Sequence, residues 1–585
     1  MTQRFLHIIW VGLLSCLPLP GATAPLPDPA DPLMVSDGPI VEEMDSPRPA
    51  IASTPLAQEI YDHLRNSPEG EEWNPDNWSA LKAFYADRAF APFWHRVGNV
   101  TKESLELLDR LENADLEGLN PDRYLVPRLR THFASHDPAR SAWADILLTA
   151  AYIRYALDER NGRFDPKLLD AAWNIPQEPY DASAALRDLI SWPSFAELLD
   201  QLPPTTDDYW RLTRALQHYR RIQDEGGWPA LPEAPTLHPG DIHPQVAALR
   251  HRLVIEGDYQ SDVEPPDLHR YDAMLKDAVI RFQQRHGLTP DAVVGPSSRA
   301  VLNVPVESRI AQIETNLERW RWMPHDMGER YLLVNAAGFE LKLIEGGVTR
   351  LRERIIAGKT KRQTPSFSSR ITSLVVNPSW TVPKRIAVED LLPRQQRNPD
   401  FLSHKHIEVF KRVHGRLTKV DPRSIDWNAY DKHHFPFLLR QKPGRHNSLG
   451  RLKFHLPNRY SIFLHDTPSK GLFNRSNRAF SSGCIRVQYP EQLADVLLQE
   501  DSSWSPKQLR RALSGHNTQI HRLSQSISIY IGYFTSWVDD DGRINFWPDI
   551  YKRNTPILQA LQQAERPNDF IAHVVPLANA PLETD

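Results

Sequence analysis

Cys484 has the surroundings of a reactive thiol. It lies in the run Ser481–Arg486 (SSGCIR), and His465 lies 19 residues before it, at the end of the apolar run Tyr460–Leu464. A thiol becomes a nucleophile on deprotonation, which a neighbouring imidazole or guanidinium promotes. These residue types point to acyl transfer through a thioester. The alternative is an inert, buried cysteine, because an unpaired cysteine often packs as a small apolar residue.

The neighbours of Cys484 suggest separate roles. His465 would accept the thiol proton. The small residues Ser481, Ser482 and Gly483 allow a substrate to approach closely, and the N–H groups of Gly483 and Cys484 would stabilise an oxyanion. Arg486 would lower the thiol pKa or bind a substrate carboxylate.

The N-terminal segment, residues 1–24, predicts export. Arg4 precedes the apolar stretch Phe5–Leu19, which has the length of a signal-peptide core and is short for a membrane span. Ala22–Ala24 resembles a cleavage site, Leu13–Cys16 resembles a lipoprotein box, and an uncleaved membrane anchor is the third option. All three place the chain outside the cytoplasm, where the single cysteine of the body cannot form an internal disulfide.

Composition narrows the possible partners. The chain has 585 residues, a net charge of −4, 24% charged and 41% apolar residues, and no later apolar run that could span a membrane. A charge this small over this length argues against nucleic acid as a partner. The spacing of histidines and cysteines suggests no metal site, and we expect no cofactor.

The length predicts several domains. Residues 25–55 are rich in proline and polar residues and predict a flexible linker. Residues 56–228 predict a helical scaffold, with strong helices at Ala142–Leu157 and Trp210–Ile222. The aromatic-dense run Tyr85–Trp94 is best explained as a helix end packed into a core.

A compact unit of helices follows a proline-rich hinge. Residues 242–304 place apolar positions at helical spacing from Val246 to Ile255 and from Met274 to Phe282, and Gly287 ends the second helix. The pattern "helix, Gly-Leu, Asp-x-x-x-Gly-Pro, helix" resembles the small three-helix peptidoglycan-binding domain; the alternative is a helical spacer. A linking helix is expected within residues 305–328.

Short strands with turn residues between them predict a mostly β domain over residues 329–565. The strands are expected at Tyr331–Asn335, Phe339–Ile344, Arg354–Gly358, Ile371–Asn377, Gly450–Phe454, Ile527–Ile531, Phe534–Val538 and Arg543–Phe546. Residues 386–440 interrupt them with helix-like sequence at Val388–Gln396 and His404–His414, and are expected to be a helical lid over the substrate. Pro556–Gln563 predicts a last helix, followed by a disordered tail at 566–585.

The two motifs together resemble a known family. His465-Asp466-Thr467-Pro468 followed by Ser481–Arg486 is similar to the signature of the L,D-transpeptidase catalytic domain, and the domain order resembles the large periplasmic branch of that family. Many members have histidine where this chain has Ser482, a difference common in the large branch. Some members have tyrosine where this chain has Phe463, so an oxyanion contact from that hydroxyl is not expected.

The resemblance implies a fold and a reaction. The fold is multi-domain α+β. A tetrapeptide stem of peptidoglycan acylates Cys484 and releases D-Ala, and the side-chain amine of a diaminopimelate residue in a second stem attacks the thioester to form a 3→3 cross-link. His465 serves as base and acid, the backbone carbonyl of Asp466 completes the triad, and Trp380 lines the site.

Two alternatives remain open from the sequence. Water or a protein amine could replace the stem amine as acceptor with the same acyl-enzyme. A non-catalytic peptidoglycan-binding scaffold is the other possibility.

Overall fold

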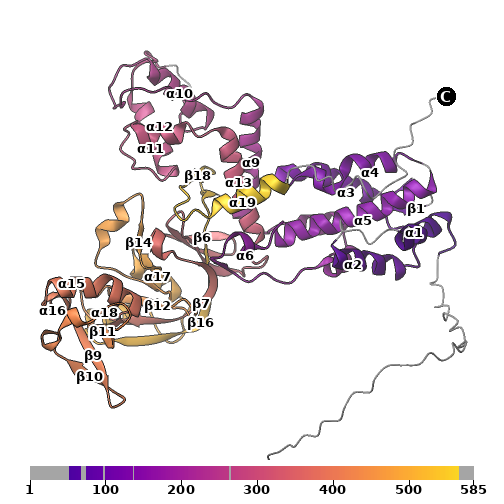
Figure 1. Ribbon diagram of the computed structural model, residues 1–585. Helices are drawn as coiled ribbons and strands as arrows, with labels where there is room; N and C mark the ends of the chain where they lie inside the picture. Colours follow the sequence, from indigo (N-terminus) through magenta and orange to yellow (C-terminus); the bar gives the residue numbers. More distant parts are fainter. Residues whose placement is uncertain (1–51, 67–73, 97–98, 136, 262–264, 565–585) are drawn as a thin grey trace, which may run out of the picture. The chain divides into compact units, whose positions relative to one another are not determined.

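The computed structural model describes residues 52–66, 74–96, 99–135, 137–261 and 265–564 (Figure 1). All of them belong to one compact unit. The expected signal or anchor segment, nearly all of the linker and the tail lie outside the described residues, so those expectations stay predictions. Across the described ranges, no helix has both the length and the apolar character that a membrane span needs.

The first part of the described chain is helical, as the sequence predicts. The long helix α5 (Pro138–Asn161) starts with a proline at its first position, and Gly162 at φ +77° ends it. The expected helices lie within α5 and α9. The run Tyr85–Trp94 ends in the core, since both of these side chains are 0% exposed. The neighbouring elements are α1 (Pro55–Asn66), α2 (Pro75–Ala86), β1 (His95–Arg96), β2 (Asn99–Val100), α3 (Lys102–Glu112), α4 (Val126–Phe133), α6 (Pro166–Leu169), β3 (Trp173–Asn174), α7 (Ala182–Ser191), α8 (Phe195–Gln201) and α9 (Asp207–Asp224).

A buried ion pair ties this scaffold to the linking helix α13 (Val306–Arg321). The Arg321 guanidinium donates to both carboxylate oxygens of Glu159 in α5, at 3.0 and 3.1 Å, and to the Tyr209 hydroxyl in α9 at 2.9 Å. Both charged side chains are 0% exposed. A buried charge needs such partners, so this pair fixes the packing of three helices.

The expected compact unit of three helices is present. It consists of α10 (Gln245–Ile255), α11 (Ala273–Arg285) and α12 (Pro296–Leu302), around a core of apolar side chains. Gly287 follows α11 at φ +66°, and a Cβ there would lie 3.0 Å from the Trp547 ring. Glycine at this position therefore provides both the left-handed turn and the close packing.

The catalytic region predicted to be β forms a sheet that closes on itself. The strands follow the order β12-β13-β15-β6-β5-β4-β16-β7, and β7 pairs again with β12. Closure removes exposed sheet edges. The strands are β4 (Arg330–Asn335), β5 (Glu340–Glu345), β6 (Val348–Gly358), β7 (Ser366–Val376), β12 (Leu452–His455), β13 (Leu464–His465), β14 (Ala479–Ser481), β15 (Ile485–Val487) and β16 (Gln519–Gly532). After β15 come α17 (Pro490–Leu497) and α18 (Pro506–Ser514), and β16 leads to β17 (Ser536–Val538), β18 (Ile544–Phe546) and α19 (Asn554–Ala564).

The insertion at 386–440 is mixed, and the expectation of a helical lid is wrong in its second half. Val388–Gln396 is helical, in a π-turn (Ala387–Leu391) and α15 (Leu392–Arg397), but His404–His414 contains strand β9 (Ile407–Val413). The side chains of Ile407 and Val409 are buried with a partly exposed one between them, which is a strand pattern. The remaining elements are α14 (Lys384–Ile386), α16 (Phe401–His404), β10 (Arg416–Val420) and β11 (Phe437–Gln441).

The insertion has its own small sheet and core. The sheet runs β10-β9-β11-β8, and β8 (Trp380–Thr381) pairs with β11 in antiparallel register, Thr381 opposite Arg440 and Trp380 opposite Gln441. Buried apolar side chains between the helices and this sheet include Val409, Trp427 and Leu439. The insertion thus has a core of its own.

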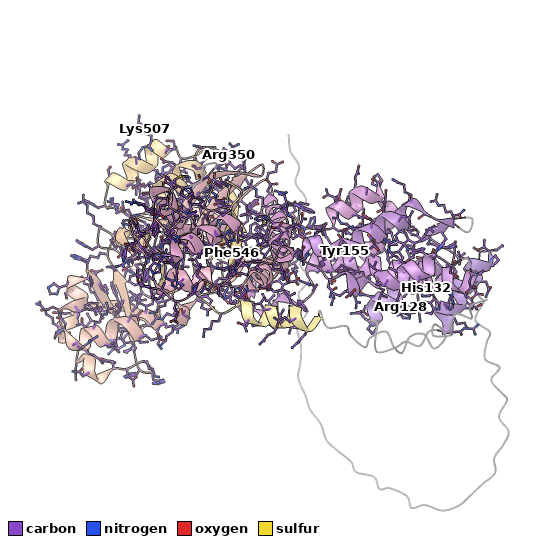
Figure 2. The ribbon with its side chains drawn as sticks, turned by 90° about the horizontal axis from the view of Figure 1, so that it is seen from above. Arg128, His132, Tyr155, Arg350, Lys507 and Phe546 are labelled. Atoms are coloured by element: carbon purple, nitrogen blue, oxygen red, sulfur yellow. The ribbon has the colours of Figure 1, made fainter. Side chains whose placement is uncertain are left out.

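Phe546, labelled in Figure 2, is the meeting point of several elements. Its ring lies 5.3 Å from Tyr219 of α9, stacks at 5.8 Å on His286 at the end of α11, and lies 4.7 Å from the guanidinium of Arg309 in α13. Aromatic and cation–π contacts of this kind stabilise packing between elements.

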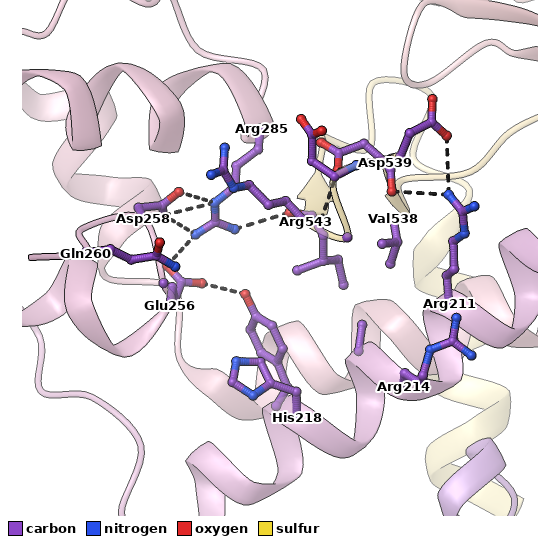
Figure 3. Close-up of a pocket in the computed structure, with 17 residues that line it drawn as sticks. Arg211, Arg214, His218, Glu256, Asp258, Gln260, Arg285, Val538, Asp539 and Arg543 are labelled. Carbon is purple, nitrogen blue, oxygen red and sulfur yellow. Dashed lines mark hydrogen bonds and ion pairs between the residues drawn. The ribbon is translucent and has the colours of Figure 1, made fainter. Parts of the chain in front are cut away.

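A charged cavity of about 740 Å³ lies near these contacts of Phe546, between α9, the end of α10 and β17–β18 (Figure 3). One group of its charged side chains is paired: Arg285 lies 2.5 Å from Asp258 and 3.0 Å from Glu256, and the Tyr219 hydroxyl donates to Glu256 at 2.8 Å. Arg285, Asp258 and Glu256 thus satisfy one another within the cavity wall.

Candidate active site

The histidine and the cysteine lie on two adjacent parallel strands or next to them. Strands β13 and β15 pair with Leu464 opposite Ile485 and His465 opposite Arg486. Cys484 directly precedes β15, so it lies at the end of the strand beside β13. The barrel closure, with β12 on the other side of β13, fixes this register.

Cys484 lies in a constrained turn. Gly483 has φ +113°, a value that residues with a side chain rarely adopt, so glycine is strongly favoured directly before Cys484. The Cys484 Sγ lies 3.7 Å from the carbonyl oxygen of Ser461, which itself has φ +56°. Strained backbone of this kind is typical of functional sites.

The histidine tautomer follows from its hydrogen bond. His465 is 4% exposed, and its Nδ1 lies 2.5 Å from the backbone oxygen of Asp466. A carbonyl only accepts, so Nδ1 carries the proton and Nε2 is the free base. The Asp466 carboxylate accepts from the N–H groups of Arg451 at 2.8 Å and Thr467 at 2.7 Å, which fixes this carbonyl.

Electrostatics keep the resting pair neutral. Burial raises the pKa of the Cys484 thiol, although the Phe463 N–H and the charges of Lys453 and Arg486 act to lower it. Burial, assisted by the charges of Arg486 and Lys453, lowers the pKa of His465 to about 3. The imidazole is therefore a free base at neutral pH and can accept the thiol proton as the sulfur attacks.

The turn before Cys484 is anchored on both sides. The Ser481 Oγ accepts from the Gly483 N–H at 3.1 Å, and the Gly483 carbonyl accepts from the Thr364 hydroxyl at 2.9 Å. The Gly483 N–H is thus engaged in this structure, so a role in an oxyanion hole requires that bond to open. The Ser482 Oγ accepts from Arg362 at 2.9 Å.

Arg486 and Trp380 occupy different positions. Arg486 stands opposite His465 in the sheet, and its Nε is buried and has no hydrogen-bond partner among the described residues. A buried donor of this kind is suited to a substrate carboxylate. Trp380 lies in β8 at the base of the insertion, paired with Gln441, and its role in lining the site stays a prediction.

Sequence reasoning missed two cationic residues of the site. Lys453 faces His465 across the β12–β13 pair, and its ammonium lies 4.0 Å from the centre of the Phe463 ring. Arg362 contacts both the insertion and the catalytic turn. Neither residue is near Cys484 in sequence, and only strand pairing brings them close.

The arrangement supports nucleophilic catalysis by a thiol with a histidine base. Among the described residues, no group of histidine, cysteine, aspartate and glutamate side chains could hold a metal ion.

The fold and the site define a multi-domain protein with a cysteine–histidine site on a closed sheet, and comparison with known families identifies its parts. Residues 329–507 match the L,D-transpeptidase catalytic domain, residues 242–302 match the family described as "Putative peptidoglycan binding domain", and residues 79–216 match the family described as "Scaffold domain". The chain therefore contains an L,D-transpeptidase catalytic domain and a peptidoglycan-binding domain, which confirms the resemblance and the fold class.

One curated relative is similar over part of its length. A protein of Haemophilus influenzae named "Putative L,D-transpeptidase" is 36% identical over 246 residues, 42% of this chain and 48% of that protein. The chain thus matches about half the length of that relative. Two solved structures are also similar: an L,D-transpeptidase from Xylanimonas cellulosilytica (15% identity, 52% of this chain, 100% of that chain, TM-score 0.17) and the Ldtfm–avibactam carbamoyl enzyme (8%, 39%, 64%, 0.17).

Proposed function

We propose that this protein is an exported peptidoglycan L,D-transpeptidase that forms 3→3 cross-links through a thioester on Cys484. The observation that carries the proposal is the parallel pairing of β13, which ends in His465, with β15, which Cys484 directly precedes, together with the Asp466 carbonyl that accepts from the His465 Nδ1–H. The match to an L,D-transpeptidase catalytic domain supports the same reaction class.

In the first half of the reaction, His465 Nε2 takes the thiol proton while Sγ attacks the carbonyl of the third stem residue, diaminopimelate. The tetrahedral intermediate collapses, the bond to the fourth residue breaks, and His465 returns the proton to the departing amine of D-Ala. Arg486 would bind a donor carboxylate, and its charge also stabilises the developing thiolate.

In the second half, the diaminopimelate side-chain amine of another stem attacks the thioester. His465 removes the proton from this amine, the C–S bond breaks, and the thiolate regains a proton. The Cys484 thiol and the His465 imidazole are then both neutral again. Peptidoglycan is the partner that the two matched domains support, and a cell-wall location agrees with them.

The acceptor decides between the transpeptidase and the alternatives left open by the sequence. Muropeptide analysis of cell wall with and without the protein is the direct test. New 3→3 dimers support the proposal. Tripeptides without dimers indicate water as acceptor, protein-linked muropeptides indicate a protein amine, and no change indicates a non-catalytic scaffold.

The pH dependence of acylation tests the neutral resting pair. Carbapenem acylation of Cys484 should be constant within about twofold between pH 5 and 8, because the base has a pKa of about 3 and the thiol pKa is raised. A histidine with an ordinary pKa of about 6.5 would slow the reaction about thirtyfold between pH 8 and pH 5. Intact-mass measurement of the adduct gives the rate, and Cys484→Ala should form no adduct.

Arg362 links the insertion to the catalytic turn. It is 8% exposed, lies 2.5 Å from Asp390 and 2.6 Å from Glu389 in the insertion, and donates to Ser482 at 2.9 Å. We infer that the insertion caps the donor site and that Arg362 couples its position to the Cys484 turn.

Substitutions on the two sides of Arg362 should separate these roles. Arg362→Ala should slow both cross-linking and β-lactam acylation about tenfold or more, because it releases the turn and the cap. Asp390→Asn should slow cross-linking more than acylation, since it weakens only the cap. Stopped-flow acylation and a cross-linking assay measure the two rates. Arg385→Ala, which removes an exposed contact to Glu389, is the control. If Asp390→Asn slowed cross-linking and acylation by the same factor, the insertion would not have a capping role.

A further inference from the structure

A groove lies between the peptidoglycan-binding domain and the loop that precedes Cys484. We propose that this groove binds the sugar portion of the peptidoglycan donor and so directs its stem peptide to the thiol. The inference rests on the proposed transpeptidase function for its substrate, and it adds a binding site for the saccharide.

The groove has a volume of about 830 Å³ and two walls. Residues 283–298, at the end of α11 and the start of α12, form one wall, and residues 472–480 form the other. The Thr289 and Ser476 hydroxyls meet across it at 3.5 Å. The close packing of the Gly287 turn on Trp547 and the His286–Phe546 stack hold the first wall in place.

The lining has the chemistry of a neutral, hydroxyl-rich ligand. Its polar side chains are mainly hydroxyls and amides, and only Asp291 and Arg475 are charged. The Phe480 ring is 43% exposed and lines the groove. A saccharide offers hydroxyl and acetamido groups for hydrogen bonds and an apolar face of C–H groups for an aromatic ring. A polyanionic ligand would call for more cations than Arg475 alone.

The distance from the groove to Cys484 fits the length of a donor stem peptide. Phe480 in β14 is four residues before Cys484, so their Cα atoms are at most about 14 Å apart. An extended stem of three residues spans about 10 Å. A sugar seated at Phe480 therefore allows the carbonyl of the third stem residue to reach Cys484.

Binding measurements in the Cys484→Ala protein test the groove without turnover. Calorimetry should show that a disaccharide–tetrapeptide binds about tenfold more tightly than the free tetrapeptide. Phe480→Ala should remove this preference. Ser297→Trp fills the groove from the opposite wall, far from Cys484 in sequence, and should do the same. Ile520→Ala, an exposed apolar residue outside the groove, should keep the preference.

The outcomes separate the groove from the reaction. If both Phe480→Ala and Ser297→Trp keep the preference for the disaccharide, the proposal is wrong. It is also wrong if either variant lowers the affinity for the free tetrapeptide as much as the affinity for the disaccharide–tetrapeptide, because the groove would then bind the peptide. If the preference is lost in both variants but the wild-type protein makes no cross-links, the groove stands and the proposed transpeptidase function fails. When the same two substitutions are made in the protein that retains Cys484, KM for the disaccharide–tetrapeptide donor should rise by a larger factor than kcat falls.

Discussion

Cys484→Ala is expected to lower the rate of cross-link formation by about 10⁴-fold or more, because no other described side chain replaces the nucleophile. The free energy of unfolding should change by about 1 kcal/mol or less, since the thiol is small and partly exposed. Muropeptide analysis and chemical denaturation measure the two effects.

The histidine provides a matched control for this substitution. His465→Ala should cost nearly as much activity, and the double variant should be no slower than Cys484→Ala alone, because residues that act as one unit are not additive. A Cys484→Ala protein that still forms 3→3 dimers at the normal rate would show that another group is the nucleophile.

Arg321→Ala is expected to have the largest effect on stability. It leaves Glu159 buried at 0% exposure without its cation, and the loss of one member of a buried pair lowers the free energy of unfolding by about 3–5 kcal/mol. Denaturant unfolding, with the midpoint and slope fitted together, measures the change.

A surface arginine and a double substitution control for this experiment. Arg350 is 56% exposed and lies 3.5 Å from Glu345, so Arg350→Ala should change stability by about 1 kcal/mol or less. Arg321→Met combined with Glu159→Gln should recover part of the loss, since no buried charge remains. A loss of less than about 1 kcal/mol in Arg321→Ala would mean that water reaches Glu159 in the folded protein.

Local sequence predicted most elements because their signals are local. Ala142–Leu157 has uninterrupted helical periodicity and no glycine or proline, and it lies within α5. The pattern around Gly287 carries its own turn and helix signals. The short motif around Cys484 identified the catalytic domain, since its small residues and arginine are adjacent in the chain.

The errors and omissions arise where structure depends on distant pairing. Charged residues such as Lys411 and Arg412 made the second half of the insertion look helical, whereas pairing with β10 and β11 makes it a strand. Lys453 and Arg362 reach the site only through the register of β12 and the turn after β6. No local pattern encodes that register, so these residues could not be found from the sequence.

The pairing of β8 with β11 has an evolutionary consequence. The chain leaves the barrel after Val376 in β7 and rejoins it at Leu452 in β12. Between these points β8 and β11 pair with each other, and paired strands lie about 4.8 Å apart. A segment whose ends meet and which has its own core can be exchanged with little disturbance to the host fold. The segment from β8 to β11, with both strands included, is thus a unit that can be exchanged. Chimeras joined on either side of this segment would transplant a lid between barrels, and lineages could diversify their donors by the same exchange.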